Sequence, residues 1–274
     1  MGAPGVLTVL QTRTASSRLP GKVLMPLGGK AVFLRLVERV RRSDLAGRVV
    51  VAKTDGIEDD PIETLCRLEG VDCFRGHPTD LLDRHYRAGL RYSADAVVKI
   101  PSDCPLIDPR IVDRVIGLYL GREGRYQYVS NLHPATYPDG NDVEVIAMEA
   151  LEEAWREATR DFEREHTTPY IWERPHRFRI GNVAWESGRD CSMTHRWTLD
   201  YEEDYRFIAA VHDALAGSRP DFGVDDILDL LERRAEFAEI NRRYLGVNWY
   251  RHHPGDLATV DASRTRIPER EGGA

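Results

Sequence analysis

The chain has 274 residues, of which 42% are apolar and 30% charged, and its formal net charge is -7 at pH 7. A globular composition without a run of about 18 apolar residues predicts a protein that does not span a membrane, and the acidic balance argues against a nucleic-acid-binding protein. Four cysteines without a Cys-x-x-Cys pair, and an N-terminus without a signal-peptide pattern, favour reduced thiols and a cytoplasmic location.

The first predicted element is a strand over residues 6–10, followed by a loop rich in cations and hydroxyl groups. The strand residues are apolar or β-branched, which predicts burial on both faces, as in a parallel sheet. The polar side chains of the loop are Gln11, Thr12, Arg13, Thr14, Ser16, Ser17, Arg18 and Lys22. Such a loop suits polyphosphate, although a solvated basic surface loop is the open alternative. Neither a Walker loop nor a Gly-x-Gly-x-x-Gly motif is present, since Ser16 stands where a Walker loop needs glycine.

Helices and strands alternate through the first half of the chain. After the loop, the pattern predicts a helix over 31–42, a strand over 48–52, a helix over 59–69, a strand over 71–74, a helix over 81–93, a strand over 96–100 and a helix over 110–121. This alternation predicts a right-handed, mostly parallel α/β sheet with helices on both faces. Because ligands lie at the carboxyl ends of such strands, we expect the loop and Asp103 to face one crevice, with Arg75 and Gly76 at a nucleobase edge.

The second half of the chain has a mixed pattern. It predicts strands over 126–130 and 143–147 around a Pro138-Asp-Gly140 turn, a helix over 150–160, strands over 178–185 and 196–199, and helices over 201–215, 224–233 and 237–244. No linker rich in Gly, Pro or Ser interrupts it. We therefore expect a single domain over residues 1–250 and a polar, flexible tail over 251–274.

The loop and several later motifs resemble those of the cytidylyltransferases. The loop pattern is Gln11-x-Arg13-x-x-Ser16-x-Arg18-Leu19-Pro20-Gly21-Lys22. The later motifs, over roughly residues 5–245, are Pro61, Arg75-Gly76, Asp83-Arg84, Asp103-Cys-Pro-Leu-Ile-Asp108, Pro138-Asp-Gly140, Asp142-Val-Glu144, Arg164-Glu-His166 and Arg196-Trp-Thr-Leu-Asp200. The chain resembles the spore-coat polysaccharide biosynthesis protein F group and, more distantly, the 3-deoxy-manno-octulosonate and acylneuraminate cytidylyltransferases. Members usually have glycine where this chain has Ala15 and Ser102.

The resemblance implies a Rossmann-like domain of the nucleotide-diphospho-sugar transferase type, with a small arm within about residues 126–195 that forms a homodimer. The implied nucleotide-binding residues are Gln11, Arg13, Ser16, Arg18, Lys22, Arg75, Gly76 and Arg84. The implied catalytic residues are Arg13, Lys22 and Asp103. The acceptor is expected near Arg84, Asp142, Glu165 and His166.

Nucleotidyl transfer also needs a divalent metal that polarises the α-phosphate. Mg²⁺ prefers one or two carboxylates together with water and phosphate oxygens. We expect Asp103 and Asp200 to bind Mg²⁺, because the resemblance places them across one crevice. The alternatives are structural: Asp103 as a turn residue, Asp200 as a helix N-cap, Arg84 as a solvated helix cation, and Glu165-His166 as a helix-start device or dimer contact.

The sequence therefore predicts a Mg²⁺-dependent cytidylyltransferase. It would transfer CMP from CTP to a small anionic acceptor, a sugar acid or a phosphate- or phosphonate-bearing metabolite, in surface polysaccharide or specialised metabolite biosynthesis. The alternatives are a sugar-1-phosphate nucleotidylyltransferase that uses another NTP, and a non-catalytic nucleotide-binding protein of the same fold. A nucleotide-sugar glycosyltransferase would need an Asp-x-Asp motif, which Ser102-Asp-Cys104 does not provide.

Overall fold

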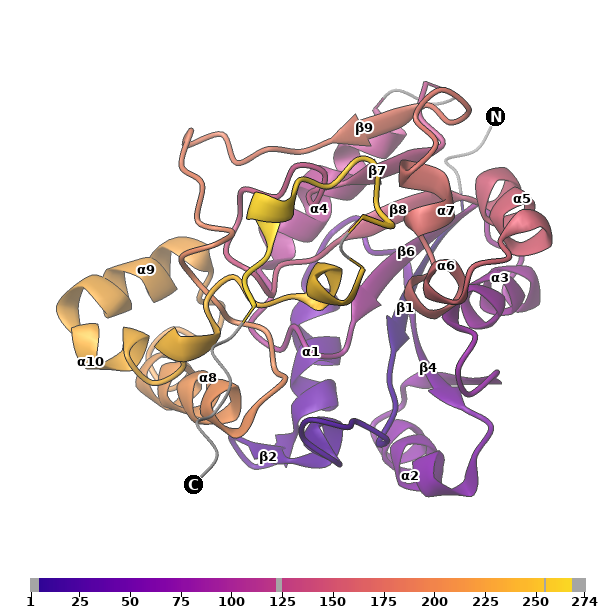
Figure 1. The fold of residues 1–274 in the computed structure, drawn as a ribbon. Helices are drawn as coiled ribbons and strands as arrows, with labels where there is room; N and C mark the ends of the chain where they lie inside the picture. The colour runs from indigo at the N-terminus through magenta and orange to yellow at the C-terminus, as the bar shows by residue number, and fades with distance from the viewer. Residues whose placement is uncertain (1–4, 122–124, 254, 268–274) are drawn as a thin grey trace, which may run out of the picture.

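The computed structural model describes residues 5–121, 125–253 and 255–267, which fold around a seven-stranded sheet (Figure 1). In their order across the sheet, the strands are β5 (Asp72–Gly76), β4 (Arg48–Thr54), β1 (Val6–Gln11), β6 (Ala96–Pro101), β8 (Glu144–Ala147), β7 (Tyr128–Ser130) and β9 (Ile180–Asn182). The first four are parallel, β8 is antiparallel to β6 and β7, and β9 is parallel to β7. The predicted Rossmann-like, mostly parallel α/β fold is confirmed.

Helices cover both faces of this sheet. The α-helices of the described residues are α1 (Val32–Val40), α2 (Asp60–Leu68), α3 (Leu81–Arg91), α4 (Pro109–Leu120), α5 (Met148–Glu157), α6 (Asp161–His166), α7 (Pro169–Trp172), α8 (Glu202–Leu215), α9 (Val224–Arg233) and α10 (Ala235–Ala238). A separate hairpin joins β2 (Pro26–Leu27) to β3 (Lys30–Ala31), and short 3-10 turns lie at Lys22–Leu24, Ile57–Asp59, Arg242–Tyr244, Trp249–His252 and Ala262–Arg264. Asp80 and Asp108 cap α3 and α4 by accepting backbone N–H groups. None of the helices in these residues has the length and apolar character needed to cross a bilayer.

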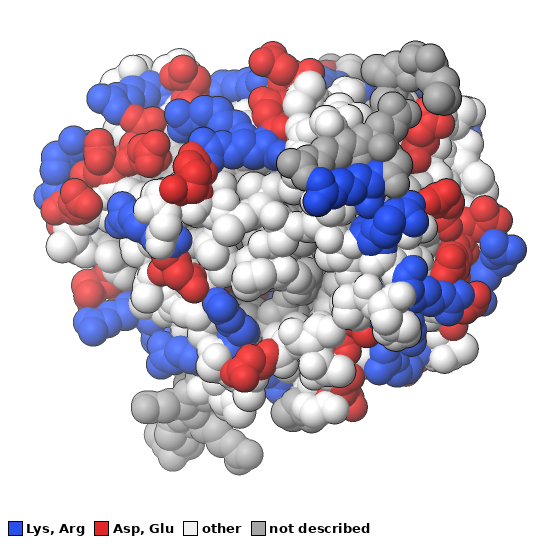
Figure 2. Space-filling model, turned by 90° about the horizontal axis from the view of Figure 1, so that it is seen from above, with Lys and Arg blue, Asp and Glu red and all other residues white. Residues whose placement is uncertain are grey.

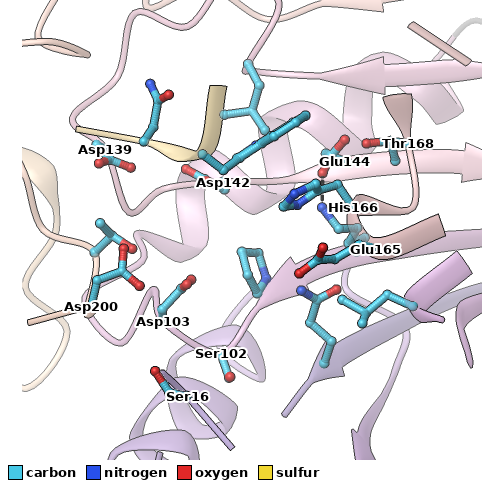
Figure 3. A pocket seen from close by; sticks show the side chains of 18 of the residues that line it. Ser16, Ser102, Asp103, Asp139, Asp142, Glu144, Glu165, His166, Thr168 and Asp200 are labelled. Carbon is cyan, nitrogen blue, oxygen red and sulfur yellow. Dashed lines mark hydrogen bonds and ion pairs between the residues drawn. The ribbon is translucent and has the colours of Figure 1, made fainter. Parts of the chain in front are cut away.

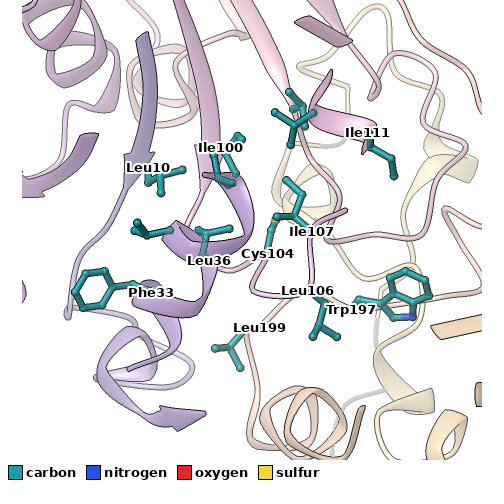
Figure 4. Close-up of a cluster of buried hydrophobic side chains, with 14 of the residues drawn as sticks. Leu10, Phe33, Leu36, Ile100, Cys104, Leu106, Ile107, Ile111, Trp197 and Leu199 are labelled. Carbon is teal, nitrogen blue, oxygen red and sulfur yellow. The ribbon is translucent and has the colours of Figure 1, made fainter. Parts of the chain in front are cut away.

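The strands bury apolar side chains on both faces, as predicted for a central parallel sheet. Along β1, Leu7 and Val9 belong to one core cluster and Leu10 to the other, because successive side chains of a strand point to opposite faces. The cluster of Leu10 includes residues of α1, α2, α4, α8 and α9, and the other includes residues of α3, α5, α6 and α7. In Figure 4, Phe33 and Leu36 of α1 lie close to Leu10 in the first cluster. This packing fixes the strand ends from which the site loops emerge.

Residues 196–199, predicted as a strand, join no strand of the sheet in the described residues. They form one isolated bridge, between Asp139 and Arg196. Leu199 donates its backbone N–H to the carbonyl of Asp103 (2.8 Å) instead of to a neighbouring strand. The segment therefore crosses the carboxyl ends of the strands, and this position brings Asp200 to the crevice.

The turn that contains Gly140 is packed against the same segment. Gly140 has a φ of +105°, and a Cβ added there would lie 2.7 Å from the carbonyl carbon of Trp197. Only glycine tolerates both the conformation and the close approach. The predicted turn at residues 138–140 is thus held against a segment far away in the sequence.

Two other predicted elements are shorter in the structure than the sequence indicates. The predicted strand over 178–185 is reduced to β9, and the predicted helix over 237–244 is divided into α10 and the 3-10 turn Arg242–Tyr244. The local sequence pattern of each segment suits the longer element that was predicted. The observed length is set instead by the neighbouring segments that each one contacts.

Much of the ranges predicted to hold the arm and the tail packs on the body of the protein, and the dimerisation role of an arm stays a prediction. Residues 126–195 contribute β7, β8, β9 and α5–α7, so most of this range belongs to the sheet and its covering helices. In the range predicted as a tail, Ala258 and Thr259 donate backbone N–H groups to Glu173 (2.6 and 2.9 Å), and Leu257 is buried. The described part of the tail therefore packs on the body through partners that local polarity does not reveal. Residues 268–274 lie outside the described residues.

Candidate active site

One wall of the candidate site is the loop that follows β1, residues 12–21. Thr14 donates its backbone N–H and its hydroxyl to Asp59 Oδ1 (2.7 and 2.6 Å). Asp59 also accepts the hydroxyl of Thr54, at the end of β4, through Oδ2 (2.6 Å). This carboxylate ties the loop to the neighbouring strand. The loop cations are therefore held at the carboxyl end of β1.

A cavity of about 290 Å³ lies between this loop, the ends of β6 and β8, and the segments 165–172, 196–200 and 247–250 (Figure 3). The predicted site residues that line it are Gln11, Arg13, Ser16, Arg18, Lys22, Arg84, Asp103, Asp142, Glu165, His166 and Asp200. Arg75 and Gly76 do not line it. Residues from both halves of the chain thus meet in one crevice.

Three cations bind the carboxylate of Asp200. Its Oδ1 accepts from Arg18 (2.7 Å) and Lys22 (3.0 Å), and its Oδ2 accepts from Arg196 (3.0 Å). Burial acts to raise the pKa of Asp200, but the charges of these partners outweigh it and lower the pKa to about 2. Lys22 Nζ also lies 3.7 Å from Asp103 Oδ2. An ammonium group therefore stands between the two carboxylates that we predicted as metal ligands.

The alternative role of Asp200 as a helix cap does not match the structure. The carboxylate of Asp204 accepts the backbone N–H groups of Asp200 and Tyr201 (2.9 and 3.0 Å) at the start of α8. Asp204 thus performs the capping interaction, and the side chain of Asp200 is left to bind the cations of the crevice.

Two further carboxyl groups face the same space as Asp103 (Figure 3). Burial, and next the charge of Asp103, raise the pKa of Asp142 to about 7. Burial also raises the pKa of Asp139 well above its ordinary value, although Arg196 donates to it (3.3 Å) and acts in the opposite direction. Carboxyl groups this crowded repel one another when ionised. A bound cation would relieve that repulsion.

Two arginines predicted to bind the nucleotide have other partners. Arg75 pairs with Glu63 and with Asp60 (3.3 Å), both in α2, and does not line the cavity. The guanidinium of Arg84 is buried and donates to the backbone carbonyls of residues 77 and 78 (3.0 and 2.9 Å). Its guanidinium therefore holds the loop before α3 in place at the edge of the cavity.

Sequence analysis missed the far wall of the cavity. Lys99 of β6 and Glu144 of β8 face each other in the strand register and form an ion pair there. A lysine within an otherwise apolar strand is the sequence signal that could have indicated this wall. Trp249 and Tyr250 also line the cavity, and no local pattern indicates that they reach it.

The sequence model of the cytidylyltransferase family matches residues 7–234, a range that includes the loop after β1, Asp103 and Asp200. The chain belongs to the cytidylyltransferase family. It is therefore a nucleotidyltransferase enzyme, as predicted. This cytidylyltransferase is 32% identical over 238 residues to the spore coat polysaccharide biosynthesis protein SpsF of Bacillus subtilis, and the alignment covers 85% of this chain and 96% of the relative.

Solved structures support the same assignment. A cytidylyltransferase from Leptospira borgpetersenii is 31% identical, with a TM-score of 0.81 over 86% of this chain and 97% of the other. A CMP:2-keto-3-deoxy-manno-octonic acid synthetase solved with CTP is 16% identical, with a TM-score of 0.56 over 76% of this chain and 98% of the other. At that identity the likeness shows the fold alone. Trp249 and Tyr250 lie beyond the residues of this cytidylyltransferase that the family model matches.

Proposed function

We propose that this cytidylyltransferase uses Mg²⁺ to transfer CMP from CTP to a sugar acid or to a phosphate- or phosphonate-bearing acceptor, with release of pyrophosphate. The observation that carries the proposal is the convergence of three loop cations and two carboxylates in one cavity: Arg13, Arg18, Lys22, Asp103 and Asp200. Cations and hydroxyl groups suit a triphosphate, and carboxylates suit its metal. The name of the Bacillus subtilis relative supports a role in surface polysaccharide biosynthesis, and the CTP in the synthetase of the same fold supports the choice of nucleotide.

In the proposed reaction, an acceptor oxygen attacks the α-phosphorus of CTP. The bond from this phosphorus to the bridging oxygen breaks, and pyrophosphate leaves. Arg18 and Lys22 would neutralise the charge that develops on the leaving group. Arg13 has no hydrogen bond or ion pair within the described residues, so it is free to bind a phosphate oxygen.

The carboxylates of the cavity fit a divalent cation. Within the described ranges, no group of three or more His, Cys, Asp or Glu side chains is arranged as a metal site. Mg²⁺ often takes one or two carboxylates and fills its other positions with water and phosphate. Asp103 is the more open candidate, because its side chain is 28% exposed and Asp200 is held by three cations. When bound, Mg²⁺ supplies a Lewis acid for the α-phosphate.

The test is pyrophosphate release with CTP, ATP, GTP and UTP, each against a panel of sugar acids, sugar phosphates and phosphonates. We expect CTP to be preferred and EDTA to stop turnover. A purine preference would favour the sugar-1-phosphate nucleotidylyltransferase reading. Nucleotide binding without release, under all conditions, would favour a non-catalytic protein.

A further inference from the structure

The cavity has two ends of different chemistry (Figure 3). Ser16, Asp103 and Asp200 lie toward one end, and Glu144 and His166 lie toward the other. We call the second end the aromatic chamber. Its walls are the rings of His133, His166, Trp172, Trp249 and Tyr250.

The rings of the aromatic chamber pack on one another. His133 stacks on Trp172 with centroids 4.3 Å apart, and His166 stacks on Trp249 at 3.8 Å. Tyr250 lies 4.7 Å from Trp249. Stacked rings of this kind form rigid apolar walls that suit the C–H faces of sugars and cationic groups.

Almost all cations that line the cavity already bind oxygen atoms of the protein. Those that line it are Arg13, Arg18, Lys22, Arg84, Lys99 and Arg196. Arg18, Lys22 and Arg196 bind Asp200, and Arg84 binds backbone carbonyls. Arg13 has no protein partner, but it stands on the loop after β1, where the proposed triphosphate would bind it. With the triphosphate bound, none of these five cations is therefore available to an anion in the aromatic chamber.

The sixth cation, Lys99, is neutralised inside the chamber wall. It pairs with Glu144, which also accepts the hydroxyl of Tyr128 (2.6 Å). The side chains of Lys99 and Glu144 are only 11% and 3% exposed. Separating a buried pair to bind another anion would leave Glu144 without its counter-ion, at a large energetic cost.

The remaining polar groups of the chamber are neutral or acidic. Burial lowers the pKa of His133 to about 4 and that of His166 to about 3, so both imidazoles are uncharged at neutral pH. Glu165 is exposed and makes no ion pair in the described part of the chain. Once the triphosphate occupies Arg13, a carboxylate or phosphate placed here would meet acids and rings without a free cation.

We propose that the aromatic chamber receives the non-reacting end of the acceptor, and that this end is a polyhydroxyl group that is neutral or carries an amine. The proposal rests on the proposed function, since it concerns the same acceptor. The acceptor can carry a negative charge at its reacting end, because the loop cations lie there. It cannot carry one at its remote end, because burial of an unpaired anion is strongly unfavourable.

The surroundings of the chamber agree with this assignment. A second cavity of about 490 Å³ shares residues with it, which are Leu132, His133, Asp139, Asp142, Trp172, Asn248, Trp249 and Tyr250. Figure 2 shows one face of the molecule, with uncharged side chains around a central hollow and most charged residues toward the rim. Asp139 and Asp142, which line both cavities, disfavour an anionic remote group.

The experiment compares three acceptor probes with the same reacting phosphate: glucosamine-1-phosphate, glucose-1-phosphate and glucuronate-1-phosphate. Calorimetry measures their binding to the full chain saturated with CTP, in EDTA to prevent turnover, and CTP is titrated separately. We expect the amine and neutral probes to bind at least about tenfold more tightly than the carboxylate probe, which corresponds to about 1.4 kcal/mol. Tightest binding of glucuronate-1-phosphate, or failure of all three to bind while CTP still binds, would overturn the proposal.

A charge-reversal variant supplies a second measurement. Glu165→Lys places a cation at the chamber and should shift the preference severalfold toward glucuronate-1-phosphate. Glu152→Lys, on α5 outside the cavity, is the matched control and should leave the order unchanged. Equal shifts in both variants would indicate a general charge effect and count against the chamber. Failure of the proposed function is distinguishable, because it would appear as no pyrophosphate release from CTP while the binding order of the probes persists.

Discussion

At the scale of single residues, Arg13 and Lys22 come from the same loop but have different surroundings. Arg13 has no hydrogen-bond partner in the described residues, whereas Lys22 is buried and donates to the Leu199 carbonyl (2.6 Å) and to Asp200. We therefore expect the free guanidinium of Arg13 to act on the ligand alone. The bonded ammonium group of Lys22 should both bind the ligand and stabilise the fold.

We therefore expect Arg13→Ala and Lys22→Ala to differ. Each should lower kcat/KM for CTP by roughly ten- to a hundredfold, because a charged hydrogen bond to phosphate contributes about 1.5–3 kcal/mol. Only Lys22→Ala should also lower the melting temperature, since it leaves a buried carbonyl without its donor. Arg75→Ala, a strand-end arginine outside the cavity, is the control for both measurements. Normal kinetics in Arg13→Ala would show that the loop does not bind phosphate.

Asp103 offers the sharpest test of the metal. Its carboxylate has only long contacts, to Cys104 Sγ (3.6 Å) and Lys22 Nζ (3.7 Å), within the described residues. Asp103→Asn should therefore fold normally and bind CTP weakly, but nearly lose turnover, because the amide lacks the charge that Mg²⁺ needs. Thermal unfolding, CTP titration and pyrophosphate release measure the three properties. Full activity at ordinary Mg²⁺ would leave Asp103 as a turn residue.

At the scale of elements, the loop after β1 depends on a carboxylate of the turn before α2. Asp59 accepts hydrogen bonds from Thr14 and Thr54. Burial acts to raise the pKa of Asp59, but these hydrogen bonds outweigh it and lower the pKa below its ordinary value of 3.8. The ionised carboxylate of Asp59 therefore stabilises the folded protein above pH 3.8, and this stabilisation is lost as the pH falls through the lowered pKa.

Asp59→Asn should raise KM for CTP more than it lowers kcat, because it loosens the loop without removing a phosphate ligand. The difference in unfolding free energy between wild type and variant should shrink as the pH falls below about 4. Steady-state kinetics and denaturant titrations at several pH values measure both effects. Asp55→Asn, an exposed neighbour, is the control. A pH-independent difference would mean that the charge of Asp59 does not hold the loop.

At the scale of the whole molecule, burial of neutral histidines couples stability to pH. His85 is fully buried in α3, and its Nδ1 donates to the Leu81 carbonyl (2.7 Å). Burial, as the largest cause, lowers the pKa of His85 to about 3. Below pH 6.5 the unfolded chain takes up a proton that the folded chain does not, so stability is lost as the pH falls from about 6.5 toward 3.

His85→Gln isolates this effect from the other titrating groups. The stability advantage of wild type over the variant should fall between pH 7 and pH 5 by at most about 1.4 kcal/mol per pH unit. Denaturant titrations across this range measure it. His176→Gln, which changes an exposed side chain, is the control for loss of an imidazole. A difference that stays constant with pH in His85→Gln would show that His85 takes up a proton equally well in the folded and unfolded chains.

Local patterns determined much of the fold. The apolar and β-branched run along residues 6–10 predicts a doubly buried strand, and the structure confirms it in β1 because helices cover both faces of the sheet. The cationic loop and Asp103 were also placed correctly in one crevice. Both follow parallel strands directly, so topology alone brings them to the same edge of the sheet.

The tertiary structure decided how the charges pair and what closes the cavity. Arg75 lies near the carboxyl end of β5, as Asp103 follows β6, yet two acids of α2 pair with Arg75 and it does not line the crevice. Residues 196–199 have a strand pattern, but they contact Asp103 and Asp139 rather than a strand. The sequence by itself determined the parallel sheet and the loop at its edge, because both follow from local periodicity and chain order. Only tertiary structure decided the partners of the loop cations and the chamber formed by Trp249 and Tyr250, because those depend on contacts between residues far apart in the chain.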